Sequence, residues 1–184
     1  MTRYIAFLRG INVGGHRIKM PRLRELFEEL EFEDVSTFIA SGNVIFSSGS
    51  EDVEELRKKI EAQLADRLGY DVPTFIRSLA ELDAVVAHAQ SEASEVDSGS
   101  SVYVIFLQKP ASVDLSSKFG ELKTEMDDFD VTGREVYWHI QGKLTDSPLF
   151  DRGLEKLMRE VPHTTRNMTT LRRLVAKLRT GPAA

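Results

Sequence analysis

The stretch with the clearest chemical character spans residues 8–21, LRGINVGGHRIKMP, and directly follows an apolar run. It contains four basic side chains and three glycines but no acid. Glycine-rich turns let neighbouring backbone N–H groups point at one anion, and basic side chains add positive charge around it. These residue types in this order therefore predict an anion-binding loop, in a chain whose formal net charge is −5.

A second polar segment, Ser41–Asn43, separates two short runs at 35–40 and 43–48 that are typical of strands. In a βαββαβ arrangement the third strand lies between the first two, so the loop after the first strand and the turn at 41–43 emerge at the same end of the sheet. We expect these two loops to be neighbours and to share one ligand. The ligand-binding residues predicted there are Arg9, Gly10, Asn12, Gly14, Gly15, Lys19, Ser41, Gly42 and Asn43.

A third polar segment, HTTRNMTTLRR at 163–173, leads into the last predicted helix. Thr165, Arg166 and Asn167 directly precede this helix, whose first backbone N–H groups have no partner within the helix. Together with these N–H groups, the three residues are candidates for holding a phosphate or a carboxylate. Ordinary capping of the helix by Asn167 is the alternative, and for this segment alone it is the favoured interpretation.

The opening loop differs from the known nucleotide-binding loops. Gly10 and Gly15 have the spacing of a P-loop, but His16 and Arg17 stand where the lysine and the Mg²⁺-binding hydroxyl are required. The glycine pattern of dinucleotide-binding folds is absent as well. A nucleotide-hydrolysing loop is therefore disfavoured.

No other catalytic or metal-binding pattern is complete. The four histidines form no close ligand pair, cysteine is absent, and no Gly-x-Ser-x-Gly motif occurs. Asp127, Asp128 and Asp130 resemble the start of a calcium loop, but the required glycine and distal glutamate are not in place. A solvated acidic cluster is the better interpretation, and we expect no metal and no cofactor.

Charge is distributed unevenly along the 184 residues. Residues 1–24 carry six bases and residues 161–184 carry five, neither with an acid, whereas residues 25–160 hold all 29 acids. If the two ends meet in space, this asymmetry indicates an anionic small molecule or nucleic acid as partner; solvated helix faces are the alternative. With no membrane-length apolar run and no signal peptide, we expect a cytoplasmic protein without a membrane partner.

Apolar periodicity shows the elements that must position these residues. The first half has the order βαββαβ, with strands at 4–8, 35–40, 43–48 and 71–77, a helix from Pro21, and a helix over 51–68 capped by Ser50. A helix opened by Ser78 and a polar linker at 91–101 follow. The second half then has a strand at 102–107, a helix around 115–122, a hairpin over 128–140, a helix from Ser147–Pro148 and a last helix after Asn167.

This order predicts an α+β protein of two ferredoxin-like halves, residues 1–90 and 91–184, with antiparallel sheets and helices packed through a shared core. The 41% hydrophobic content suffices for such a core. The sequence indicates no oligomeric state.

The sequence also resembles the DUF1697 family, bacterial proteins of about this length without an assigned function. The resemblance covers nearly the whole chain and rests on RGINVGG at 9–15, KM at 19–20, SGNVIF at 41–46 and TRN at 165–167. It implies two related α+β halves and supplies no catalytic residue. Where the family pattern continues from Arg-Asn into tryptophan, this sequence has Met168, which removes an aromatic stacking surface.

Three functions are open from the sequence. The first is an anion-binding module for a phosphorylated small molecule or a nucleic-acid backbone, which uses the glycine- and asparagine-bearing loops. The second is an enzyme for a phosphorylated or carboxylated substrate, with Arg9 and Lys19 or Arg166 stabilising charge and His16 as acid or base. The third is a protein-interaction or scaffold role for the basic ends.

Overall fold

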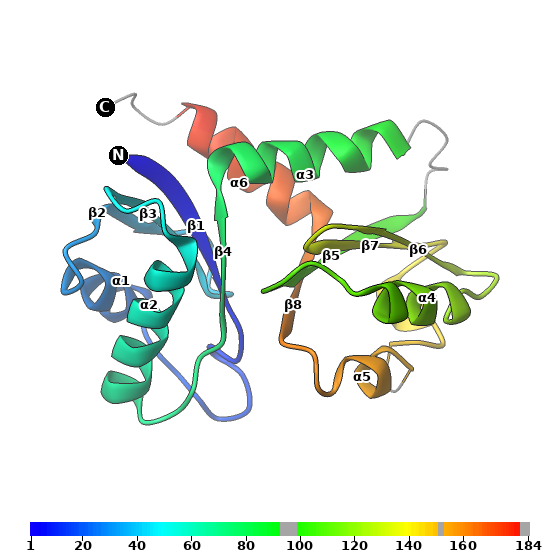
Figure 1. Cartoon of the computed structure of the whole chain (residues 1–184), viewed down its shortest axis with the longest axis horizontal. Helices are drawn as coiled ribbons and strands as arrows, with labels where there is room; N and C mark the ends of the chain where they lie inside the picture. Colours follow the sequence, from blue (N-terminus) through cyan, green and yellow to red (C-terminus); the bar gives the residue numbers. More distant parts are fainter. Residues whose placement is uncertain (93–98, 151–152, 181–184) are drawn as a thin grey trace. The chain divides into compact units, whose positions relative to one another are not determined.

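The chain contains two units with the same α+β plan, Met1–Glu81 and Leu82–Ala184. The computed structural model describes residues 1–92, 99–150 and 153–180 (Figure 1). Each unit holds one four-stranded antiparallel sheet. The predicted class, α+β with two ferredoxin-like halves, is confirmed.

Unit 1 has the strand order β2-β3-β1-β4, which is the order expected of a βαββαβ unit. The third strand therefore lies between the first and the second, as predicted. The elements are β1 (Thr2–Leu8), α1 (Met20–Glu28), β2 (Glu33–Thr37), β3 (Asn43–Ser48), α2 (Val53–Leu68), β4 (Thr74–Ser78) and the start of α3 (Leu79–Glu92).

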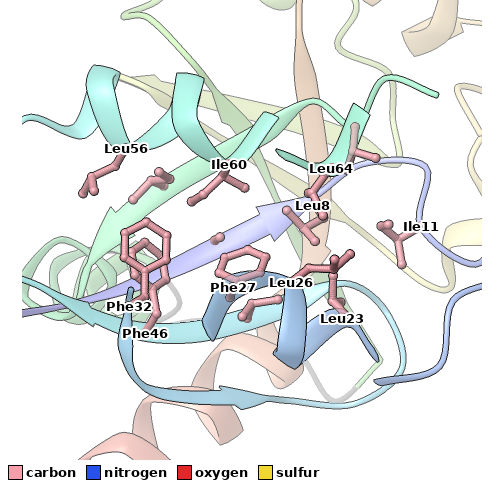
Figure 2. Close-up of a cluster of buried hydrophobic side chains, with 14 of the residues drawn as sticks. Leu8, Ile11, Leu23, Leu26, Phe27, Phe32, Phe46, Leu56, Ile60 and Leu64 are labelled. Carbon is pink, nitrogen blue, oxygen red and sulfur yellow. The ribbon is translucent and has the colours of Figure 1, made fainter. Parts of the chain in front are cut away.

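The core of unit 1 lies between α1, α2 and one face of the sheet (Figure 2). Apolar residues spaced three or four apart fall on one side of a helix, and these are the buried ones here. Their burial removes apolar surface from water, which is the main favourable term in folding. The buried side chains include Leu23, Leu26 and Phe27 from α1, Leu56, Ile60 and Leu64 from α2, and Tyr4, Ala6 and Leu8 from β1.

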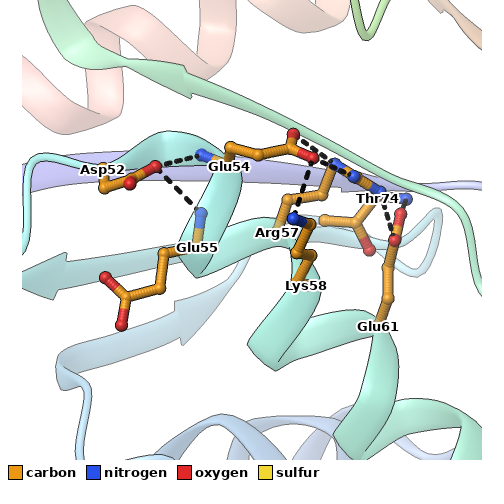
Figure 3. A network of polar contacts seen from close by, with 7 residues as sticks. All are labelled: Asp52, Glu54, Glu55, Arg57, Lys58, Glu61 and Thr74. Carbon is orange, nitrogen blue, oxygen red and sulfur yellow. Dashed lines mark hydrogen bonds and ion pairs between the residues drawn. The ribbon is translucent and has the colours of Figure 1, made fainter.

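Helix α2 begins two residues later than a Ser50 cap would require, and Asp52 rather than Ser50 is its cap. The Asp52 carboxylate accepts hydrogen bonds from the Glu54 and Glu55 backbone N–H groups at 3.0 Å (Figure 3). The Ser50 hydroxyl instead accepts from Asp52 N at 3.2 Å, closing a turn before the helix. An acidic cap also suits the positive end of the helix dipole.

A polar network then ties α2 to the edge strand β4 (Figure 3). Arg57 pairs with Glu54 and with Glu61 on the same helix. The second oxygen of Glu61, Oε1, accepts a hydrogen bond from the Thr74 backbone N–H at 2.9 Å. Because Thr74 is fully buried, this contact satisfies a donor that water does not reach.

Unit 2 repeats the same sheet order, β6-β7-β5-β8. One face of its sheet packs against α4 and α5 around Phe119, Trp138 and Met158, while α6 packs against β5 and β8. Besides α3, the elements are β5 (Ser101–Leu107), α4 (Val113–Glu121), β6 (Asp127–Thr132), β7 (Glu135–Ile140), the 3₁₀ turn η1 (Leu144–Asp146), α5 (Gly153–Met158), β8 (His163–Asn167) and α6 (Met168–Thr180).

The helix predicted from Ser147–Pro148 is wrong at its start, because α5 begins at Gly153. The Ser147 hydroxyl accepts from Leu149 N at 3.0 Å and donates to Asp127 at 2.7 Å. This pair of bonds fixes a turn next to β6 instead of a helix cap. Strand β8 was not expected at all, since its five residues HTTRN lack an apolar pattern.

Asp127 is a buried hydrogen-bond acceptor, not part of the solvated cluster that the sequence suggested. It is 1% exposed. Its Oδ1 accepts from Trp138 Nε1 at 2.8 Å and from the Ser147 hydroxyl, and its Oδ2 accepts from the Thr124 hydroxyl at 2.7 Å. The carboxylate therefore joins β6, β7 and two loops within unit 2.

The two units also repeat individual residues. Strand register places Phe46 opposite Tyr4 in unit 1 and Trp138 opposite Tyr103 in unit 2, so an aromatic pair recurs at the same place. The repeat gives each loop of one unit a counterpart in the other. Positions that match by register are Tyr4 with Tyr103, Phe7 with Phe106, Leu8 with Leu107, and Arg77 with Arg166.

The unit boundary falls between Glu81 and Leu82, in the first turn of α3. A domain boundary at residue 90 stays a prediction. The predicted linker at 91–101 falls largely on residues 93–98, which lie outside the described residues. None of the helices in the described part of the chain has the length and apolarity needed to cross a membrane.

Candidate functional site

The connection between β1 and α1 is longer than the fold requires. It takes residues 9–19 in unit 1, whereas residues 108–112 make the equivalent connection from β5 to α4 in unit 2. The sheet order is the same in both units, so the shorter loop is sufficient to join such a strand and helix. The connection at 9–19 is six residues longer and holds the glycines and bases noted above, and binding residues are commonly carried on such loops.

Two buried isoleucines anchor this loop at its ends. Ile11 and Ile18 are 4% and 8% exposed and belong to the core of unit 1. The Asn12 side-chain oxygen accepts a hydrogen bond from Ile18 N at 2.8 Å, which closes the loop on itself. The residues between them, 13–17, are exposed. We call residues 9–19 the basic loop from here on.

The turn between β2 and β3 packs beside the start of this loop, as predicted. Leu8 N donates to Gly42 O at 2.8 Å, and Asn12 Nδ2 donates to Ala40 O at 3.4 Å. Gly42 has a φ of +73°, and a Cβ there would lie 3.2 Å from Leu8 Cβ and 3.3 Å from Ile11 Cβ. Both the backbone conformation and the space therefore require glycine.

Replacing Gly42 by alanine should lower the free energy of unfolding by about 1.5 kcal/mol, from backbone strain and the close contacts together. Gly14→Ala is the matched control, because Gly14 also has a positive φ, +58°, but nothing lies within 4 Å of its added Cβ. Urea denaturation measures both variants. Equal losses in the two would show that the packing of the turn on the loop contributes nothing.

Not every residue predicted for the site is exposed to a ligand. Asn43 is fully buried, and its Nδ2 donates to Phe38 O at 3.0 Å and to the Ser41 hydroxyl at 2.8 Å. It shapes the turn from within, whereas the Ser41 side chain is exposed at its surface. Contact of Ser41, Gly42 and Asn43 with a ligand stays a prediction.

Positive charge gathers on the same loop. Arg9, His16, Arg17 and Lys19 are all exposed, and Arg9 N donates to Pro73 O at 2.9 Å, which fixes the backbone where the loop begins. Backbone conformations of positive φ recur along the loop, a pattern typical of anion-binding nests. These residues are Gly10 at 80°, Asn12 at 59°, Gly14 at 58° and Gly15 at 93°.

The N-terminus of α1 adds to this charge. In α4, the counterpart in unit 2, the Ser112 hydroxyl accepts from Leu115 N at 3.1 Å and caps the helix. The equivalent residue of α1 is Lys19, which makes no side-chain cap, and the first turn of α1 contains no acid. The positive end of the α1 dipole is thus compensated by no side chain of its own cap or first turn.

The loop tip packs on one aromatic residue. The His16 and Tyr70 ring centroids lie 3.8 Å apart. The Tyr70 hydroxyl is buried and has no hydrogen-bond partner among the described residues. Burial accordingly raises the pKa of the Tyr70 phenol.

Tyr70→Phe should raise the free energy of unfolding by up to about 1 kcal/mol, because it removes a buried donor that lacks a partner and keeps the ring beneath His16. Thermal and urea denaturation check this. A loss of stability in Tyr70→Phe would mean that the hydroxyl has an acceptor in solution. Tyr4→Phe provides the comparison, because the Tyr4 hydroxyl donates to Ser50 O at 3.2 Å and its removal breaks a hydrogen bond.

The third predicted segment belongs to unit 2 and has structural roles there. Arg166 Nη1 donates to the Thr164 hydroxyl at 2.8 Å and to Thr165 O at 3.0 Å, and burial lowers the pKa of Arg166 to about 10. The Asn167 side-chain oxygen accepts from Thr169 N at 2.8 Å, which is the capping alternative. Binding of an anion by Thr165, Arg166 and Asn167 stays a prediction.

Sequence reasoning missed one further polar cluster in unit 2. His88 Nε2 lies 2.5 Å from Asp130 Oδ2, and the His88 ring centroid lies 4.5 Å from that of Tyr137. The contact joins α3 to the sheet, and no local motif signals it because the residues are far apart in sequence. Across residues 1–92, 99–150 and 153–180, no three acidic or histidine side chains are placed to hold a metal ion.

Fold and loop together define a protein of two related α+β halves, of which the first carries an extended, basic, glycine-rich loop. The chain belongs to the DUF1697 family, described as a protein of unknown function, whose model matches residues 1–137. The resemblance noted in the sequence is thus confirmed.

A solved structure shares the fold. The conserved bacterial protein SP0830 from Streptococcus pneumoniae superimposes with a TM-score of 0.73 at 22% identity, over 96% of this chain and 98% of that chain. At this identity the similarity establishes the fold alone. No curated protein matches the sequence.

Proposed function

We propose that this protein binds an anionic ligand, a phosphorylated small molecule, through the basic loop of unit 1. The observation that carries the proposal is the difference between equivalent connections in the two units. Unit 2 joins strand to helix with residues 108–112, and unit 1 uses residues 9–19 and fills them with glycine and positive charge.

Three features of the loop supply what a phosphate group needs. Backbone N–H groups in left-handed and turn conformations donate hydrogen bonds without a side-chain entropy cost. The helix α1 begins at Met20 without a side-chain cap, so its dipole favours a negative charge nearby. Arg17 and Lys19 are exposed on either side of the buried Ile18 and add charge-assisted donors.

The loop is also held in shape before any ligand arrives. The bond from Ile18 N to Asn12 Oδ1 and the packing of Ile11 in the core restrict both ends. A preorganised loop loses less conformational entropy on binding, so more of the interaction energy appears as affinity. A nucleic-acid backbone, an enzymatic reaction and a scaffold role remain the alternatives, and they differ from the proposal in what the protein should bind or turn over.

The experiment is calorimetric titration of the full chain at low salt with inorganic phosphate, AMP and a short single-stranded RNA, supported by thermal shift. A ligand at about 100 times its dissociation constant should add roughly 2.7 kcal/mol to the free energy of unfolding. The proposal expects saturable binding of phosphate compounds that weakens with salt. Binding of the RNA alone would contradict the proposal in favour of a nucleic-acid backbone. Absence of a binding signal with all three compounds would show that the proposal is wrong.

A further inference from the structure

Two branched apolar side chains are exposed at the two loops that form the candidate site. Val13 is 58% exposed and Ile39 is 43% exposed. They adjoin a bonded pair, because Asn12 precedes Val13 and donates through Nδ2 to the carbonyl of Ala40, which follows Ile39. The basic loop thus has apolar surface beside its positive charge.

The backbone at Ile39 is unfavourable for that residue. Its φ is +52°, in the left-handed region that glycine and asparagine adopt most readily. Among the described residues with positive φ, Ile39 is the one with a β-branched side chain; the other non-glycine residues are Asn12, Glu31 and Asp34. A strained conformation normally persists because packing over-determines it, yet Ile39 keeps 43% of its surface exposed.

Ile39, at a positive φ, and Val13, with more than half of its surface exposed, both depart from what local stability favours. Isoleucine is poor at a positive φ, and neither side chain gains the stability that a buried position would give. Sites where a sequence departs from what its fold favours are commonly sites of function. A ligand that covers these side chains would supply the missing contact, while its anionic group meets Arg17 and Lys19.

We propose that the ligand is an organic phosphate whose phosphate-bearing part carries an aromatic ring with apolar faces, the chemistry of a nucleoside monophosphate. This inference rests on the proposed anion binding by the basic loop. The phosphate lies against the loop and the start of α1, and the ring lies over Val13 and Ile39. The positive charge of Arg17 and Lys19 favours the phosphate, and the apolar contact with Val13 and Ile39 favours the ring.

The test compares inorganic phosphate, ribose 5-phosphate and AMP by calorimetry on the full chain. AMP should bind about tenfold or more tightly than ribose 5-phosphate, because only AMP carries a ring that buries apolar surface. Val13→Ser and Ile39→Asn should each weaken AMP about fivefold and leave inorganic phosphate unchanged.

Ile39→Asn gives a second readout that a purely structural role would not produce. It should raise Tm by roughly 2–3 °C, because asparagine accepts the left-handed conformation, while it weakens AMP binding. Increased stability with reduced affinity supports the inference. Unchanged AMP affinity in both variants overturns it.

The outcomes distinguish this inference from the proposal that the basic loop binds an anion. Equal affinity for AMP, ribose 5-phosphate and phosphate would retain the anion site and overturn the ring contact. If phosphate, ribose 5-phosphate and AMP all fail to bind, anion binding itself is wrong, and the inference is overturned with it.

Discussion

Asp127→Ala is expected to lower the free energy of unfolding by about 3 kcal/mol, the largest loss of stability predicted here. The carboxylate accepts hydrogen bonds from Trp138 Nε1, from the Ser147 hydroxyl and from the Thr124 hydroxyl. Truncation leaves the indole N–H and the Ser147 hydroxyl buried without their acceptor, and it leaves a cavity beside Trp138. Urea denaturation, followed by the fluorescence of this single tryptophan, reports on the affected core directly.

Asp128→Ala is the matched control. Asp128 is the next residue, its side chain is 64% exposed, and it pairs with Lys123 at 2.5 Å on the surface. Exposed ion pairs contribute little, so its replacement should change the free energy of unfolding by no more than about 0.5 kcal/mol. Similar losses in both variants would contradict the role assigned to the buried network.

Arg17→Ala combined with Lys19→Ala should weaken phosphate binding about 30-fold or more, equivalent to about 2 kcal/mol, while the fold stays intact. Both side chains are exposed, so their loss removes charge and donors without opening the core. Calorimetric titration with inorganic phosphate measures the affinity, and thermal denaturation confirms folding. The slope of affinity against salt concentration should also fall, because fewer cations face the ligand.

The control for this variant is Lys58→Ala combined with Lys118→Ala. It removes the same charge from exposed helix positions, where each lysine pairs with an acid four residues earlier. Net charge alone would weaken phosphate binding equally in the two double variants. A specific site at the basic loop predicts a large loss of phosphate affinity when Arg17 and Lys19 are replaced. It predicts almost no loss when Lys58 and Lys118 are replaced.

The fold could be predicted in large part because its core follows simple periodicity. Leu23, Leu26 and Phe27 have helical spacing, and each of them is buried. Strand β8 could not be found this way, because HTTRN contains no apolar residue and its order comes from pairing with β5. Residue propensities do not predict a strand whose conformation depends on pairing with a distant segment of the chain.

The proximity of the two loops in unit 1 followed from topology alone. Once the third strand lies between the first two, the basic loop and the turn at Gly42 must share one end of the sheet, and the bond from Leu8 N to Gly42 O bears this out. The sequence did not predict which residues shape the site from within and which face outward. Asn43 has the same residue type as Asn12 but is buried under the turn.

Other features needed coordinates for physical reasons. The roles of Asp127 depend on Trp138 and Ser147, which no motif links to it. The positive φ of Ile39 contradicts its residue type, so propensity argues against it. The surplus length of the 9–19 connection becomes visible only when strand register matches the two units position by position.

The most direct test of the central claim is an NMR titration of the ¹⁵N-labelled full chain with inorganic phosphate. A site at the basic loop predicts saturable shifts in the amide resonances of Gly10, Asn12, Gly14 and Gly15 and of the first turn of α1, with little change elsewhere. Shifts centred on other residues, or none at millimolar phosphate and low salt, would contradict the assignment of the loop as an anion site.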